Sequence, residues 1–121
     1  MRLVRTTVLI VDDHPSFRAS ARAVLEADGF VVVGEARDGG EALRLVQELR
    51  PDVVLLDVQL PDLTGFEVAE RLGARNGASP SIVLVSSRDA ADYGGQIAEC
   101  GARGFVPKSE LSGTAVRALL T

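Results

Sequence analysis

The chain has 121 residues, of which 46% are hydrophobic and 25% are charged, and its formal net charge is −4 at pH 7. This length allows one domain with a single core, which we place at residues 1–121, and the composition is that of an ordinary globular protein. Acidic and basic residues are interspersed, which excludes a basic stripe for nucleic acid on this domain, and no apolar run reaches the roughly 20 residues that span a membrane. The chain opens without a signal-peptide pattern and Cys100 has no second cysteine to pair with, so we expect a cytoplasmic protein.

The first apolar run, residues 8–11, predicts a buried strand that ends at the carboxylates of Asp12 and Asp13. A helix is expected next, because Pro15 suits the first turn of a helix and Gly29 suits its end. The buried stripe of this helix is predicted to contain Phe17, Ala21, Val24 and Leu25.

A second, less protected strand is expected at residues 31–36, with a second helix after it. Asp38 and Glu41 have the spacing of a capping box, and Pro51 ends the helical pattern. The buried stripe of this second helix is predicted to contain Ala42, Leu45, Val46 and Leu49.

The central run, residues 53–56, is apolar without alternation and therefore predicts a strand buried on both faces, ending at Asp57. A third helix is expected after Gly65, and residues 76–80 have the composition of a loop. The residues that this third helix directs inward are predicted to be Phe66, Ala69 and Leu72.

The last third of the chain predicts strands at residues 82–85 and 104–106, which lead to Ser86 and Lys108. We expect a fourth helix between them, softened by Gly94 and Gly95, because each interior glycine costs about 0.8 to 1 kcal/mol relative to alanine. Replacing both glycines by alanine is therefore predicted to stiffen this helix. The inward residues are expected to be Ala90, Tyr93, Ile97 and Cys100 in the fourth helix, and Leu111, Ala115, Ala118 and Leu119 in a final helix.

Five strands that alternate with five helices predict a parallel sheet covered by helices on both faces. Ligands bind beyond the carboxyl ends of such strands, so the polar residues at these ends are expected to meet at one edge. These residues are Asp12, Asp13, Asp57, Ser86 and Lys108. Each also has a simpler interpretation, since Ser86 or Ser87 could cap the fourth helix and Lys108 could be a solvated lysine.

The expected cluster of carboxylates has a chemical consequence. Two carboxylates about 4 Å apart repel by roughly 4 kcal/mol at an effective dielectric constant of about 20, so three together require a cation or raised pKa values. An all-oxygen site with few protein ligands favours Mg²⁺ that serves phosphates, whereas His14 without a second imidazole is a weak indication of a transition metal. Phosphoryl transfer is the reaction class indicated, with Asp57 as the nucleophile that forms an acyl phosphate.

Across its whole length the chain resembles the receiver domains of bacterial response regulators. The matching residues are Asp12, Asp13, Asp57 with Leu60, Pro61 and Gly65 after it, Ser86, Phe105 and Lys108. The resemblance implies an α/β, flavodoxin-like (βα)5 fold with strand order 2-1-3-4-5. It also implies that Asp57 accepts a phosphoryl group from a partner sensor histidine kinase, in a protein that catalyses only its own phosphorylation and dephosphorylation.

The resemblance further implies roles for individual residues. Mg²⁺ would be held by Asp13, Asp57 and the backbone carbonyl of Gln59, with Asp12 supporting it. Ser86 and Phe105 would shift together on phosphorylation and remodel the surface of the last two helices and last strand, through which a homodimer could form. The residues Gln59 and Arg88 would border the path of the hydrolytic water and tune the lifetime of the phosphorylated state. Phe105 replaces the tyrosine frequent in the family, which removes a hydroxyl from the switch.

Two short segments narrow the resemblance to the branch whose receivers precede a LuxR/NarL-type helix-turn-helix domain. These segments are Asp12-Asp13-His14-Pro15 and Pro107-Lys108-Ser109. DNA would then be bound through a C-terminal domain, not through the receiver. Two alternatives stay open: a haloacid-dehalogenase-type phosphatase, which should show Asp-x-Asp at the first strand end, and an interaction module that works without phosphorylation.

Overall fold

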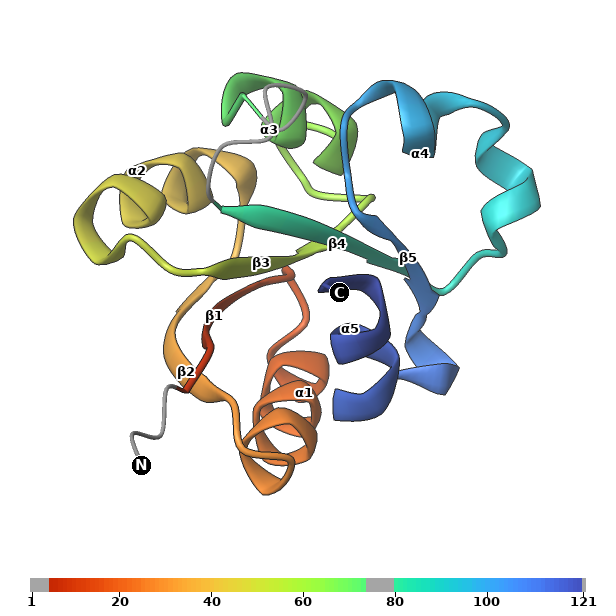
Figure 1. Ribbon diagram of the computed structural model, residues 1–121. Coiled ribbons are helices and arrows are strands. Elements are labelled where there is room, and N and C mark those ends of the chain that lie inside the picture. Colours follow the sequence, from red (N-terminus) through yellow and green to blue (C-terminus); the bar gives the residue numbers. More distant parts are fainter. Residues whose placement is uncertain (1–4, 74–79, 121) are drawn as a thin grey trace.

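The computed structural model describes residues 5–73 and 80–120, which form a five-stranded parallel sheet between two layers of helices (Figure 1). The strands run in the order β2-β1-β3-β4-β5, which confirms the predicted fold. Their bounds are Thr7–Val11 (β1), Val31–Ala36 (β2), Val53–Asp57 (β3), Ser81–Ser86 (β4) and Gly104–Pro107 (β5).

Alternation along the strands divides the core into two halves. Leu9 and Val11 of β1 point to one face of the sheet, whereas Val8 and Ile10 point to the other. The first face is covered by α2 (Gly39–Leu49), α3 (Gly65–Arg71) and α4 (Gln96–Glu99), and the second by α1 (Pro15–Ala27) and α5 (Gly113–Leu120) (Figure 1). Because both faces are covered, β3 is buried along its entire length, as its apolar sequence predicts.

The buried stripes of α1 and α2 agree with the sequence except at one position in each helix. Ala21 and Leu25 of α1 are buried, but Val24 is 36% exposed, because the line of contact with the sheet runs at i, i+4 spacing and leaves Val24 beside it. In α2, Leu49 is 39% exposed. Its Cδ1 atom lies over Gly34 of the edge strand β2, so one side of the leucine covers the strand while the other faces solvent.

The starts of α2 and α3 show one expected cap and one that the sequence analysis missed. Asp38 Oδ1 accepts a hydrogen bond from the Glu41 N–H at 2.8 Å, but the Glu41 carboxylate bonds the N–H of Arg37 and does not complete a capping box. A complete box is present at α3, where Thr64 and Glu67 each accept a hydrogen bond from the other's backbone N–H.

The prediction of one continuous fourth helix is wrong. A 3-10 helix, η2 (Ala90–Tyr93), is followed by Gly94 at φ 58°, ψ −132°, and only Gln96–Glu99 then form an α-helical turn. An L-residue rarely adopts this backbone conformation, so alanine at Gly94 would strain the chain. The predicted stiffening by alanine at both glycines therefore does not hold for Gly94.

Two of the residues expected to point inward, Ala90 and Ala118, are exposed, and the other remaining expectations are confirmed or untested. Cys100 is a buried core residue, and a further 3-10 helix, η3 (Lys108–Glu110), separates β5 from α5. The predicted loop falls largely on residues 76–79, which lie outside the described residues. Among the helices described, none is long and apolar enough to cross a bilayer.

Candidate functional site

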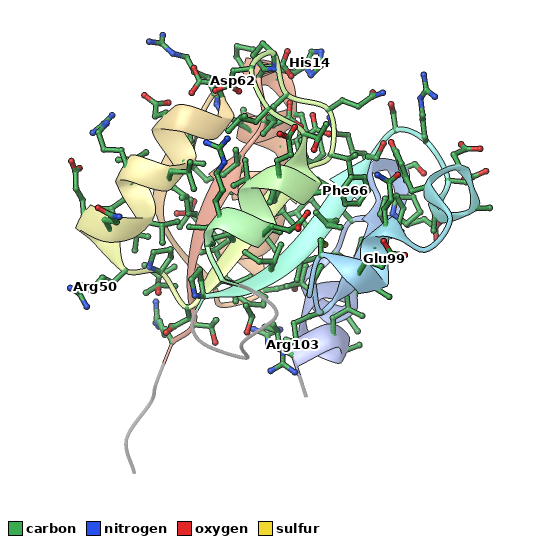
Figure 2. The ribbon with its side chains drawn as sticks, turned by 90° about the horizontal axis from the view of Figure 1, so that it is seen from above. His14, Arg50, Asp62, Phe66, Glu99 and Arg103 are labelled. Atoms are coloured by element: carbon green, nitrogen blue, oxygen red, sulfur yellow. The ribbon has the colours of Figure 1, made fainter. Side chains whose placement is uncertain are left out.

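The carboxyl ends of four strands bring the predicted residues to one edge of the sheet. Asp12 follows β1, Asp57 is the last residue of β3, Ser86 the last of β4, and Lys108 follows β5. The register is continuous across this edge, since Asp57 pairs with Val85 and Ser86 with Pro107. Figure 2 shows His14 and Asp62 at this edge, whereas Arg50 and Arg103 lie away from it.

Lys108 forms the electrostatic centre of the site. Its Nζ lies 2.6 Å from Asp12 Oδ2 and 3.4 Å from Asp57 Oδ2, and its side chain is 17% exposed. The ammonium also lies 4.6 Å from the centre of the Phe17 ring, a contact that sequence reasoning missed because α1 supplies it from a distant part of the chain. The solvated-lysine interpretation of Lys108 is therefore wrong.

Burial and neighbouring charges shift the pKa values of Asp57 and Lys108. Burial raises the pKa of Asp57 to about 6, and the neighbouring Asp12 carboxylate adds to this shift, while Lys108 opposes it. For Lys108, burial by itself would lower the pKa, but the carboxylates of Asp12 and Asp57 outweigh burial and raise it. The carboxylates of Asp12 and Asp57 therefore repel each other, and the Lys108 ammonium partly relieves this repulsion.

The donor set fits a hard divalent cation. One ligand atom from each of Asp12, Asp13, His14 and Asp57 can be chosen so that all lie within 4.8 Å of one another. Asp12 Oδ2 is fully buried and accepts no hydrogen bond of regular geometry, its partner being the Lys108 ammonium. Three carboxylates whose oxygens converge in this way are chemically suited to Mg²⁺.

His14 is 65% exposed, in agreement with its interpretation as a surface residue of the first turn. Its Nδ1 nevertheless lies 3.0 Å from Asp12 Oδ1 and 3.2 Å from Asp13 Oδ1. Its backbone N–H also donates to Asp12 Oδ1 at 2.8 Å, which orients that carboxylate.

The loop between β3 and α3 is tied to the neighbouring α2. The Gln59 N–H donates to Asp57 Oδ1 at 3.3 Å, and the Gln59 side chain is exposed. Asp62 accepts hydrogen bonds from the N–H groups of Gly39 and Gly40 at 2.8 and 2.9 Å. Sequence reasoning missed Asp62, because its partners lie more than 20 residues away and only the assembled sheet brings them together.

Ser86 is buried and does not cap a helix. Its Oγ accepts a hydrogen bond from the Arg88 N–H at 3.0 Å and lies 2.6 Å from the Tyr93 hydroxyl. Phe105 is half-buried beside Tyr93, with ring centres 5.9 Å apart, and Arg88 is exposed. Tyr93 was expected only as a packing residue, so its polar contact is new.

A five-stranded sheet of this order with an acidic cluster and a lysine at its carboxyl edge defines a class of signalling domain. The chain belongs to the response regulator receiver domain family, whose pattern matches residues 8–119. The phosphatase alternative is not favoured by this match.

Two of the curated relatives are regulators of transcription by name. A putative transcriptional regulator of Pseudomonas aeruginosa is 39% identical over 103 residues, which are 85% of this chain and 49% of that protein. The DNA-binding transcriptional activator EvgA of Escherichia coli K12 is 38% identical over 102 residues, which are 84% of this chain and 50% of EvgA. The chain thus spans about half the length of these curated relatives.

Solved structures agree with this assignment. A LuxR-family two-component response regulator from Aurantimonas superposes with a TM-score of 0.84 at 34% identity, covering 97% of this chain and 84% of the other. The receiver domain of the putative response regulator NarL from Mycobacterium tuberculosis gives 0.83 at 32% identity and covers 98% of both chains. The chain is therefore a receiver domain that is similar to those of LuxR-family transcriptional regulators.

Proposed function

We propose that this receiver accepts a phosphoryl group on Asp57 and thereby switches a transcription-regulating output. The observation that carries the proposal is the position of the Asp57 carboxylate, buried at the end of the central strand beside Lys108 and the Asp12–Asp13 pair. A carboxylate oxygen attacks phosphorus, the bond to the donor's leaving group breaks, and an acyl phosphate results. The chain thus catalyses its own modification and turns over no separate substrate.

The neighbouring residues divide the remaining work. Asp13, Asp57 and the backbone carbonyl of Gln59 would hold Mg²⁺, with Asp12 supporting it, and the bound ion would neutralise charge on the phosphoryl oxygens. Lys108 holds one of these oxygens with its ammonium, and Ser86 holds another with its hydroxyl. Ser86 and Phe105 then carry the change to the surface formed by α4, β5 and α5.

The lifetime of the acyl phosphate depends on a water molecule in line with the bond to be broken. Gln59 and Arg88 follow the nucleophile and the switch hydroxyl by two positions, and both side chains are exposed at the carboxyl edge. We propose that Arg88 pairs with a phosphoryl oxygen and restricts this water. Arg88→Ala should then shorten the phosphorylated lifetime.

The partners follow from the same chemistry. A sensor histidine kinase would supply the phosphoryl group from a phosphohistidine, and the altered surface of α4, β5 and α5 would form a homodimer. The name of EvgA as a DNA-binding activator of about twice the aligned length supports an output domain that binds DNA in a longer protein.

The test is incubation with acetyl phosphate and Mg²⁺, followed by intact-mass measurement. The protein should gain one phosphoryl group, and Asp57→Asn should gain none. Asp13→Ala, which keeps the nucleophile, should require a higher Mg²⁺ concentration. Equal labelling of Asp57→Asn would overturn the assignment of the acceptor.

A further inference from the structure

The Ser86 hydroxyl is held by two hydrogen bonds that both come from the segment after it. The Arg88 N–H donates to Ser86 Oγ, and the Tyr93 hydroxyl lies 2.6 Å from the same atom. A hydroxyl has one proton and two acceptor sites, so these two partners occupy much of its capacity. In this structure the switch hydroxyl is therefore engaged with η2 and not with the Asp57 carboxylate.

Tyr93 is itself fixed by two aromatic rings from other elements. Its ring meets that of Phe66 in α3 edge-on, with centres 5.5 Å apart, and lies 5.9 Å from that of Phe105 in β5. Figure 2 shows Phe66 on the side of α3 that faces the segment carrying Glu99. These three rings, which we call the aromatic cluster, hold the phenol in place while its hydroxyl reaches Ser86.

The rest of the segment contributes little to this anchoring. Between residues 87 and 99 every side chain is exposed except those of Tyr93 and Ile97. Gly94 follows Tyr93 directly with a φ of 58°, which gives the backbone a break immediately after the anchor. The segment is therefore attached to the site chiefly through Tyr93.

We propose that Tyr93 is the positioning residue of the Ser86 hydroxyl, which it holds in the resting state and releases when Asp57 is phosphorylated. This inference rests on the proposed function. A phosphoryl oxygen accepts a charge-assisted hydrogen bond, which is roughly twice as strong as one between two neutral hydroxyls, so it wins the competition for Ser86. Phe105 has no hydroxyl, so among these three rings Tyr93 is the one that can make this bond.

The chain offers a direct optical readout. It contains one tyrosine and no tryptophan, so its ultraviolet fluorescence comes from Tyr93. On phosphorylation by acetyl phosphate with Mg²⁺, the emission should change as the Ser86 bond is lost. Resting Ser86→Ala, which also lacks this bond, should already emit like the phosphorylated wild type.

Tyr93→Phe removes the hydroxyl and keeps the aromatic cluster. Because one hydrogen bond to Ser86 no longer has to be broken, we expect this variant to be phosphorylated about 2- to 10-fold faster than wild type. Ser87→Ala is the matched control, since it removes an exposed hydroxyl one residue further along, and both its rate and its emission change should equal those of the wild type.

Two results would overturn the inference: unchanged emission in protein that mass measurement shows to be phosphorylated, or a rate for Tyr93→Phe no higher than that of Ser87→Ala. Failure of the wild type to gain a phosphoryl group would instead overturn the proposed function, and the inference with it. Circular dichroism of each variant verifies that the fold is kept.

Discussion

The two ends of the helical layer formed by α2, α3 and α4 are held in different ways. At one end α2 buries Ala42 and Val46, and its first turn is capped by the carboxylates of Asp38 and Asp62. At the other end η2 and α4 contain no fully buried residue and are separated by the break at Gly94.

This difference teaches how one small domain keeps its site rigid while part of it moves. Asp62 ties the loop that follows Asp57 to α2, so the acceptor and the proposed Mg²⁺ ligand Gln59 lie at the firmly held end. Ser86 is bonded to the loosely packed side through Tyr93. Elements that move are drawn from regions of low local stability, which is where few apolar contacts are made.

The largest expected effect is on amide hydrogen exchange. Opening free energies range from near zero in weakly packed segments to the global value of about 5 to 15 kcal/mol in the core, so amides of residues 90–100 should exchange on the order of 100-fold faster than those of residues 42–49. Phosphorylation should alter protection in residues 90–100 and leave α2 unchanged. Equal protection of both segments would remove the distinction between the two ends.

Replacing each of three glycines by alanine should change the free energy of unfolding by different amounts in the two regions. A Cβ at Gly65 would lie 2.5 Å from the Asp57 carbonyl oxygen, part of the rigid strand end, so Gly65→Ala should cost about 3 kcal/mol. Gly94→Ala meets no atom but strains the backbone, and should cost about 1 to 2 kcal/mol. Gly95 has an ordinary φ of −80° and only the flexible Glu99 side chain nearby, so Gly95→Ala should stabilise by about 0.5 kcal/mol. Urea unfolding measures all three, and a cost at Gly95 equal to that at Gly65 would contradict the comparison.

The smallest expected effect concerns Asp62 and pH. Its slight burial would raise its pKa, but hydrogen bonds from the N–H groups of Gly39, Gly40 and Leu63 outweigh burial and lower it. A lowered folded-state pKa means that this carboxylate stabilises the fold above its unfolded-state pKa and ceases to do so as pH falls through the folded-state value. Asp62→Asn should therefore cost about 0.5 to 1 kcal/mol at pH 7, because an exposed cap is partly screened by solvent, and this cost should shrink as pH falls through the lowered folded-state pKa.

Urea unfolding of wild type and Asp62→Asn at pH 7 and at pH 2 measures this difference. Glu110→Gln, which changes an exposed carboxylate of η3, serves as the comparison for removing one negative charge. A cost for Asp62→Asn that is the same at both pH values would show that the carboxylate's charge does not contribute.

The sheet and most of its edge could be predicted from the sequence, because each strand is a short apolar run that ends in a polar residue. Val53 to Leu56 can be buried on both faces only in a covered parallel sheet, and that arrangement places Asp57 and Ser86 at one edge. The break in the expected fourth helix could not be predicted, because the apolar spacing at Tyr93 and Ile97 suits a continuous helix and gives no sign of the positive φ at Gly94.

What the sequence alone determined about this protein is the order of its elements and the residues that reach the carboxyl edge, because burial patterns and strand ends are properties of neighbours along the chain. The tertiary structure alone decided which distant groups meet there: Phe17 beneath the Lys108 ammonium, Asp62 at the start of α2, and Tyr93 at Ser86. These contacts join separate elements, and a side chain's partner across a fold depends on the packing of layers, which no local pattern encodes.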